Sequence, residues 1–186
     1  MRFFVGKNGS DAILNAGGIV KDALQAYDKT YPIEKPGNLI YHICFTKGTL
    51  VYGKNKFEPI ENIKIGDSVY SYNFEKNEIE LNRIINVLNR ETKILYQIIT
   101  ENEKINVTTE HPFYVINKGW VKAMNLESGQ VLKSANLKSD IIILGIKEES
   151  KTVTVYNIEV DGNHNYFVTK SNVLVHNKNI GQIKKE

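Results

Sequence analysis

The chain contains one cysteine, Cys44, which opens the segment Cys44-Phe-Thr-Lys-Gly-Thr-Leu-Val51. A cysteine thiolate is a strong nucleophile, so this residue could begin a covalent reaction. A second segment, Val173-Leu-Val-His-Asn177, places His176 and Asn177 close to the C-terminus. Three interpretations of Cys44 stay open at this point: a small buried hydrophobic residue, a reactive thiol, or a catalytic nucleophile.

Two further polar clusters stand at predicted strand ends, namely Thr108-Thr-Glu-His111 and His164. Each cluster alone has an ordinary structural explanation, because such side chains form local hydrogen bonds and are common in turns. An Asn that follows a strand is likewise often a turn former. The occurrence of these clusters together with Cys44 and Asn177, in this order, instead favours a shared chemical role.

The composition argues against several classes of function. With 186 residues and a hydrophobic fraction of 41%, the chain can form one domain with a core and a small appendage. The net charge of +3 is mild and the lysines are spread out, which argues against nucleic-acid binding. One cysteine excludes an internal disulfide, and four scattered histidines without C-x-x-C or H-E-x-x-H patterns indicate no metal site. We therefore expect neither a metal nor an organic cofactor.

The first 43 residues differ from the rest of the chain. Ser10 or Asp11 can cap a short helix whose apolar residues recur at helical spacing up to Tyr27. The stretch 32–37, with two prolines and a glycine, then indicates a linker and a domain boundary before Cys44. The N-terminus has no apolar segment typical of a secretory signal, and no apolar run is long enough to span a membrane.

After the boundary the sequence has the period of β-strands. Asn-Lys-Gly at 117–119 predicts a hairpin turn, Asp-Gly-Asn-His at 161–164 predicts a second turn, and Ala123–Leu126 suits one helical turn. Many short strands separated by Gly and Asn turns predict an all-β domain. The candidate strands are 69–74, 79–88, 93–100, 104–108, 112–116, 120–121, 141–146, 152–160 and 166–169.

The segment from Cys44 to Asn177 resembles a Hint domain, the self-processing fold of inteins, bacterial intein-like domains, pretoxin modules of polymorphic toxins and hedgehog C-terminal domains. Five motifs carry the resemblance in order. They are the Cys44 segment, Ile-Gly-Asp-Ser-Val-Tyr-Ser-Tyr-Asn at 65–73, Val-Thr-Thr-Glu-His-Pro-Phe-Tyr-Val at 107–115, Val-Tyr-Asn-Ile-Glu-Val-Asp-Gly-Asn-His-Asn-Tyr-Phe-Val at 155–168, and the segment ending at Asn177.

The resemblance implies a fold and a division of the chain. The expected fold is a flattened β horseshoe with pseudo-two-fold symmetry, preceded by the short N-terminal helix. Its first and last strands would lie side by side and hold the two ends of the domain close together.

Residues 1–43 would be an upstream flank, 44–177 the self-processing domain, and 178–186 a short downstream flank. The implied partner is the chain's own flanking polypeptide, with no nucleic acid, no membrane, and a monomeric state. The expected location is cytoplasmic, or exported as part of a larger bacterial protein.

The resemblance also implies an autoprotease with two reactions. In the first, Cys44 attacks the carbonyl of Ile43 in an N–S acyl shift, which turns the peptide bond into a thioester. Thr108 would hold this peptide and His111 would protonate the leaving nitrogen.

In the second reaction, the side-chain amide of Asn177 cyclises and cleaves the bond before Lys178. The resemblance implies that His164 and His176 supply protons and hold the carbonyl oxygen.

Two positions depart from the intein pattern, and a third residue affects the first reaction sterically. Splicing in most inteins needs Cys, Ser or Thr after the terminal Asn, but Lys178 stands there, and residues 178–186 contain none of the three. We therefore expect cleavage without efficient splicing. Asn157 stands where many inteins have an Asp that aids the thiol step, and the β-branched Ile43 crowds the attacked carbonyl.

Other functions are compatible with some of these features. A degenerate Hint domain that serves as a structural or interaction module is the main alternative, and it differs in that the chain would not fragment. A cysteine hydrolase that acts on other proteins is disfavoured, because Cys44 begins the domain with a peptide immediately upstream. Sterol transfer of the hedgehog kind is disfavoured because no apolar extension follows the core.

Overall fold

The computed structural model describes residues 43–135 and 141–177. The predicted N-terminal helix, the linker and the downstream flank therefore lie outside the described residues. Within the described part the chain forms strands and two 3-10 turns, η1 (Ile60–Asn62) and η2 (Ala123–Asn125), and no α-helix. No helix in these ranges is long and apolar enough to span a membrane. The expected all-β class is confirmed, and η2 lies at the predicted helical turn.

The strands of the described ranges join into one twelve-stranded network in the order β3-β2-β11-β12-β7-β9-β10-β1-β6-β5-β4, with β8 paired to β7. Their bounds are β1 (Phe45–Thr46), β2 (Leu50–Tyr52), β3 (Phe57–Pro59), β4 (Ser68–Asn73), β5 (Glu78–Thr100), β6 (Lys104–Val107), β7 (Pro112–Val115), β8 (Gly119–Lys122), β9 (Val131–Leu132), β10 (Ile141–Val160), β11 (Asn165–Val168) and β12 (Val173–His176).

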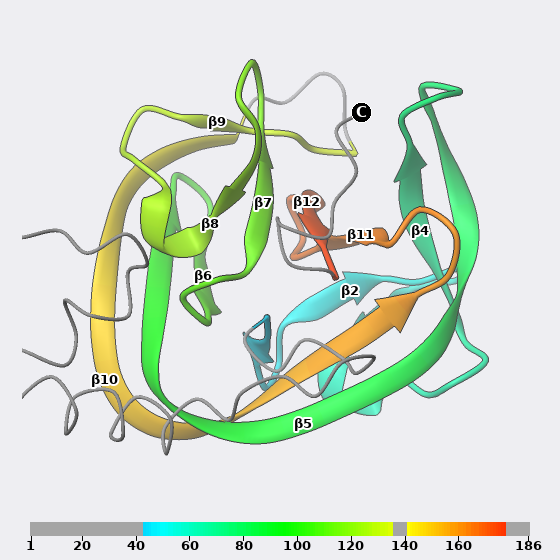
Figure 1. Ribbon diagram of the computed structural model, residues 1–186, viewed down its shortest axis with the longest axis horizontal. Coiled ribbons are helices and arrows are strands. Elements are labelled where there is room, and N and C mark those ends of the chain that lie inside the picture. Colours follow the sequence, from blue (N-terminus) through cyan, green and yellow to red (C-terminus); the bar gives the residue numbers. More distant parts are fainter. Residues whose placement is uncertain (1–42, 136–140, 178–186) are drawn as a thin grey trace, which may run out of the picture. The chain divides into compact units, whose positions relative to one another are not determined.

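Two long strands, β5 and β10, are the largest elements of the fold. They pair antiparallel over most of their length, with register shifts at three places that include Ser150–Val153. Figure 1 shows them curving together around the shorter strands. The sequence predicted two separate strands in place of each, because the polar stretches 89–92 and 147–151 looked like connections. These stretches stay extended because each pairs with the facing long strand, 89–92 with 153–156 and 147–150 with 94–97, and because neither contains Gly or Pro.

The β7–β8 hairpin forms as predicted. Val115 pairs with Gly119, and the turn between them uses positive φ angles at Asn117 (65°) and Gly119 (78°). Both residue types tolerate this backbone conformation, which explains why the signal is readable from the sequence. The hairpin matters for the site because β7 begins directly after His111 and pairs with β12 on its other side.

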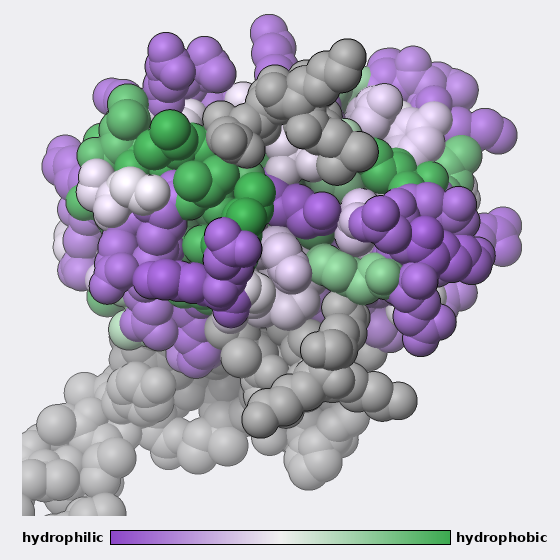
Figure 2. Space-filling view, turned by 90° about the horizontal axis from the view of Figure 1, so that it is seen from above, coloured by the Kyte–Doolittle hydropathy of each residue, from purple (hydrophilic) through white to green (hydrophobic). Residues whose placement is uncertain are grey.

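The predicted strand 141–146, a continuous apolar run, is buried on one face only. Ile141 and Ile143 are buried, whereas Ile142 and Leu144 are 47% and 56% exposed. Figure 2 shows apolar residues reaching the surface among hydrophilic ones. A continuous apolar run does not distinguish a strand covered on both faces from one covered on a single face.

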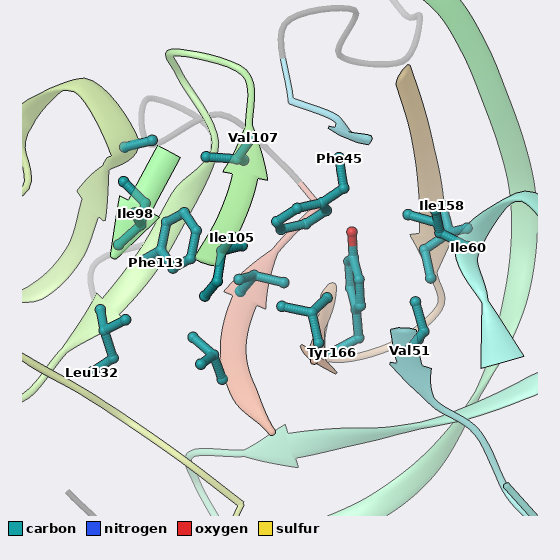
Figure 3. Packing of buried hydrophobic residues seen from close by; sticks show 14 of the residues in the cluster. Phe45, Val51, Ile60, Ile98, Ile105, Val107, Phe113, Leu132, Ile158 and Tyr166 are labelled. Carbon is teal, nitrogen blue, oxygen red and sulfur yellow. The ribbon is translucent and has the colours of Figure 1, made fainter. Parts of the chain in front are cut away.

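The main core contains aromatic and aliphatic side chains from both ends of the domain (Figure 3). Phe45 follows the candidate nucleophile, Phe113 lies on β7, and Tyr166 lies on β11; all three are fully buried. The Phe45 and Phe113 rings meet edge to face with centroids 6.3 Å apart. The residues that could do chemistry are thus direct neighbours in the chain of fully buried core residues.

Phe113→Ala should destabilise the domain by about 3–5 kcal/mol, because it removes a fully buried ring and leaves a cavity. Ile85→Ala on the outer face of β5, where Ile85 is 43% exposed, should change stability by less than about 0.5 kcal/mol. Urea unfolding of both variants measures the difference. An equal loss of stability in the two variants would contradict the assignment of Phe113 to the core.

Candidate active site

The Cys44 peptide is held by three hydrogen bonds to Thr108, a residue 64 positions away. The Cys44 backbone N donates to Thr108 Oγ1 at 2.8 Å. The Thr108 hydroxyl donates to the Cys44 carbonyl oxygen at 3.2 Å, and the Thr108 backbone N donates to the same oxygen at 2.9 Å. Both residues are buried, as is Ile43 on the other side of the peptide bond. The peptide between Ile43 and Cys44 is therefore fixed in a dry environment.

His111 lies in the same turn as Thr108, and its backbone N donates to the Thr108 carbonyl at 3.2 Å. Its ring packs on Phe45 with centroids 4.1 Å apart and is completely buried. Neither ring nitrogen has a hydrogen-bond partner among the described residues. Burial holds the pKa of His111 well below its ordinary value of 6.5, and the neighbouring charge of His176 lowers it further. His111 is therefore a neutral imidazole near pH 7.

The Cys44 thiol is buried beside Leu95 and Val155 and forms no disulfide. Burial raises its pKa from 9.0 to about 11, even though the charge and a hydrogen bond of Arg90 act in the opposite direction. The thiol is thus protonated at neutral pH, and Arg90 is the group that stabilises its ionised form.

Asn177 follows β12 and is enclosed by the turn that carries His164. Its backbone N donates to the His164 carbonyl at 2.9 Å. In the orientation that satisfies both polar atoms of its side chain, Nδ2 donates to the His164 carbonyl at 2.6 Å and Oδ1 accepts from the Val160 backbone N. His164 has a positive φ of 52°, and its Nδ1 lies 3.0 Å from the Val160 carbonyl. The side chain of Asn177 is thereby held next to its own backbone.

His176 belongs to β12, and its ring meets Trp120 edge to face with centroids 4.8 Å apart. β12 pairs with β7 through Val175 and Phe113. Continued by two residues, this antiparallel register places Asn177 opposite His111. Strand pairing therefore brings the C-terminal group to the turn that also holds Cys44.

The two ends of the domain meet in a way that differs from the expectation. β1 pairs with β10 and β6, and β12 pairs with β11 and β7, so the first and last strands are not paired with each other. The Thr108–His111 turn lies between them, because β6 precedes it and β7 follows it. The sequence could not reveal this, since each strand alone fits several neighbours.

Five of the six predicted catalytic residues lie at this junction or next to it and are buried: Cys44, Thr108, His111, His176 and Asn177. His164 is half-buried in the turn next to Asn177. Lys178 lies outside the described residues. Asn157 is buried, its Oδ1 accepts from the Ile158 backbone N at 2.9 Å, and its Nδ2 has no hydrogen-bond partner among the described residues.

Two residues near Cys44 were missed by the sequence analysis. Arg90 lies in the stretch that was taken for a connection, and the pairing of Arg90 with Val155 brings it to the thiol. Had the sequence analysis treated β5 as one continuous strand, it would have placed Arg90 opposite Val155. Tyr166 was seen only as a strand residue, and the pattern gave no signal for its contact with the site.

The described residues contain no group of three or more His, Cys, Asp or Glu side chains arranged to hold a metal ion.

The Pretoxin HINT domain family matches residues 50–178, which is most of the chain. The chain belongs to this family. A comparison with curated proteins gave no match. Hint domains process their own polypeptide, so membership identifies the flanks of the domain as its substrate. The expected Hint class of the fold is confirmed by the same finding and by the solved structures.

The bacterial intein-like domain from Clostridium thermocellum is 36% identical, with a TM-score of 0.68; the match covers 72% of this chain and 98% of that one. The DnaB intein from Synechocystis sp. PCC 6803 is 20% identical, with a TM-score of 0.65, and the match covers 73% and 99% of the two chains. The second likeness is one of fold alone.

The buried Cys44 thiol should react slowly with iodoacetamide in the folded Hint domain. A pKa of about 11 instead of 9.0 lowers the thiolate fraction near neutral pH by roughly 100-fold, and only the thiolate is alkylated. Mass spectrometry of the native chain and of the chain in concentrated guanidinium chloride measures the two rates. Equal rates would show that the thiol is accessible and ionised, contrary to the structure.

Proposed function

We propose that this Hint domain is a single-turnover autoprotease that cleaves its own chain at both ends, at Ile43–Cys44 and before Lys178. The observation that carries the proposal is the set of hydrogen bonds by which Thr108 holds the Cys44 peptide beside the neutral, buried His111. A fixed orientation of nucleophile and carbonyl can supply a large part of the barrier reduction in an intramolecular reaction.

The first reaction is an N–S acyl shift. The Cys44 thiol loses its proton, and its sulfur forms a bond to the carbonyl carbon of Ile43. The bond from that carbon to the Cys44 nitrogen then breaks, and the nitrogen leaves as an amine that takes up a proton. Water or an external thiol cleaves the resulting thioester and releases residues 1–43.

The buried side chains suit this sequence of proton transfers. Neutral His111 can accept the thiol proton, and its lowered pKa favours passing that proton on to the leaving nitrogen. Thr108 Oγ1, at 2.8 Å from the Cys44 nitrogen, keeps this nitrogen in place as it changes from amide to amine. Arg90 stabilises the thiolate before it attacks. General acid–base transfers of this kind typically contribute about 10²- to 10⁴-fold to the rate.

The second reaction is the cyclisation of Asn177. Its Nδ2 loses a proton and forms a bond to its own backbone carbonyl carbon, the bond to the Lys178 nitrogen breaks, and that nitrogen takes up a proton. The chain then ends in a succinimide. The hydrogen bonds to His164 and Val160 restrict the side chain to a region next to the scissile bond. His176 and His164 are the proton donors and acceptors at this end.

Efficient splicing is not part of the proposed function. Joining the two flanks requires a nucleophile after Asn177 to receive the upstream acyl group, and residues 178–186 contain no Cys, Ser or Thr. The thioester is therefore consumed by water or thiols, and the domain acts as a monomer on its own flanks.

A second candidate function is a degenerate Hint domain kept as a structural or interaction module. The raised pKa of Cys44, its complete burial, and an amide at Asn157 favour a slow or inactive thiol. The two functions differ in one observable property, since only the autoprotease fragments on standing.

Intact-mass spectrometry of the purified chain, near neutral pH with and without dithiothreitol, tests the proposal. We expect thiol-accelerated release of residues 1–43 and thiol-independent release of residues 178–186. Cys44→Ala should abolish the first release and Asn177→Ala the second, because each removes the attacking group.

Asn55→Ala, at an exposed position, is the matched control and should cleave like the unmodified chain. A chain that stays whole under both conditions would contradict the autoprotease and support the module.

Lys178→Cys should create a ligated product in which residues 1–43 are joined to residues 178–186. The new thiol can accept the acyl group from the Cys44 thioester before Asn177 cyclises, and the amine then replaces the sulfur. Lys178→Ala is the control and should give cleavage only. If Lys178→Cys cleaves at both ends but no ligated mass appears, the absence of a downstream nucleophile is not what prevents splicing.

A further inference from the structure

Tyr166 carries a buried hydroxyl group for which the fold provides no partner. The residue lies on β11 between β2 and β12 and is completely buried. Its oxygen has no hydrogen-bond partner among the described residues. A hydroxyl buried in this way costs about 1–3 kcal/mol relative to one that is hydrogen-bonded, so a Phe at this position would favour the fold.

The hydroxyl is directed toward the first strand of the domain. Figure 3 shows the Tyr166 ring among apolar side chains with its oxygen pointing toward Phe45, the residue after Cys44. Tyr166, Phe45 and Ile158 belong to the same core cluster. The hydroxyl thus approaches the beginning of β1 from within the core.

Electrostatics also connects Tyr166 with Cys44. Burial raises the pKa of Tyr166 well above its ordinary value of 10, and negative charge on Cys44 raises it further. Two consequences follow. The hydroxyl keeps its proton throughout the neutral range, and it lies close enough to Cys44 to respond to charge there.

The direction of the scissile peptide determines where the Ile43 carbonyl oxygen points. In a trans peptide the N–H and the preceding C=O point in opposite directions. Because the Cys44 N–H points to Thr108, the Ile43 carbonyl oxygen points away from Thr108. Thr108 follows β6, and on the other side β1 pairs with β10 through Phe45 and Tyr156.

The register between β1 and β10 relates Ile43 to the core cluster that contains Tyr166. Extended by two residues, the pairing of Phe45 with Tyr156 places Ile43 opposite Ile158. The Ile43 carbonyl is therefore directed toward β10, where Ile158 belongs to the same core cluster as Tyr166.

We propose that the Tyr166 hydroxyl donates a hydrogen bond to the oxyanion that forms on the Ile43 carbonyl oxygen when the Cys44 sulfur attacks. This inference rests on the proposed acyl shift and adds a catalytic residue to it. As the carbon–sulfur bond forms, the π electrons of the carbonyl move to the oxygen. Tyr166 keeps its proton and stabilises this charge until the electrons return and the bond to the Cys44 nitrogen breaks.

A donor whose acceptor is the oxyanion of the transition state is expected to have no hydrogen-bond partner in the resting state. An oxyanion in a dry interior is a much stronger hydrogen-bond acceptor than the neutral Ile43 carbonyl from which it forms. Donors of this kind act in the transition state more than in the ground state, which is the condition for catalysis. This role explains both why the Tyr166 hydroxyl has no partner at rest and why the fold retains a hydroxyl that costs stability.

Tyr166→Phe in the full chain tests the proposal, because it removes one oxygen and keeps the ring. We expect the thiol-dependent release of residues 1–43 to slow by about 100-fold, the typical effect of deleting one oxyanion donor. The Asn177-dependent release of residues 178–186 should change by less than about twofold, and the urea midpoint should stay or rise. Tyr156→Phe, half-buried and paired with Phe45, is the matched control and should release both flanks at the original rates.

The outcomes separate the inference from the proposed function. If the unmodified chain releases no upstream flank with thiol, the proposed function fails. If it does and Tyr166→Phe releases the flank equally fast, the inference alone is wrong. Equal slowing of both releases, a lower urea midpoint or loss of folding would show that the hydroxyl supports the structure, and would also overturn the inference.

Discussion

The contact between Thr108 and the backbone of Cys44 is the interaction on which the site depends. One threonine hydroxyl accepts from the Cys44 nitrogen and donates to the Cys44 oxygen, which uses both capacities of the group. The contact fixes the start of β1 against the turn after β6. That turn also carries His111 and leads into β7, the strand that pairs with β12. The position of the C-terminal Asn177 therefore depends on the same turn as the position of Cys44.

Burial determines the chemical character of this junction. In a dry interior the uncharged forms are favoured, so the Cys44 thiol keeps its proton and the His111 imidazole stays neutral. In the proposed reaction such a pair holds no charge at rest and becomes charged only as the reaction proceeds. Groups that stabilise developing charge then matter most, and both Arg90 and Tyr166 interact electrostatically with Cys44. The fold thus combines a stable resting state with an interior in which each electrostatic interaction is strong.

The β5–β10 pair positions these groups from the outside. β10 pairs with β1 next to Cys44 and with β5 along most of its length. Arg90 reaches the thiol because β5 continues through a polar stretch without interruption. A Hint domain has to hold two reactive ends that are far apart in sequence, and a long antiparallel pair can do so without a helix. The family membership of residues 50–178 and the likeness to the Clostridium thermocellum intein-like domain agree with this arrangement.

The sequence by itself determined the all-β class, the β7–β8 hairpin and the residue types of the site. These features depend on local patterns: period-two alternation, an Asn-Lys-Gly turn, and five motifs in a fixed order. Only the tertiary structure decided that 78–100 and 141–160 are single strands, because pairing keeps their polar middles extended. It alone decided that the Thr108–His111 turn joins the two ends, while β1 and β12 are not paired with each other. The tertiary structure alone also showed that the Tyr166 hydroxyl has no partner among the described residues, since whether a donor has an acceptor depends on residues distant in the chain.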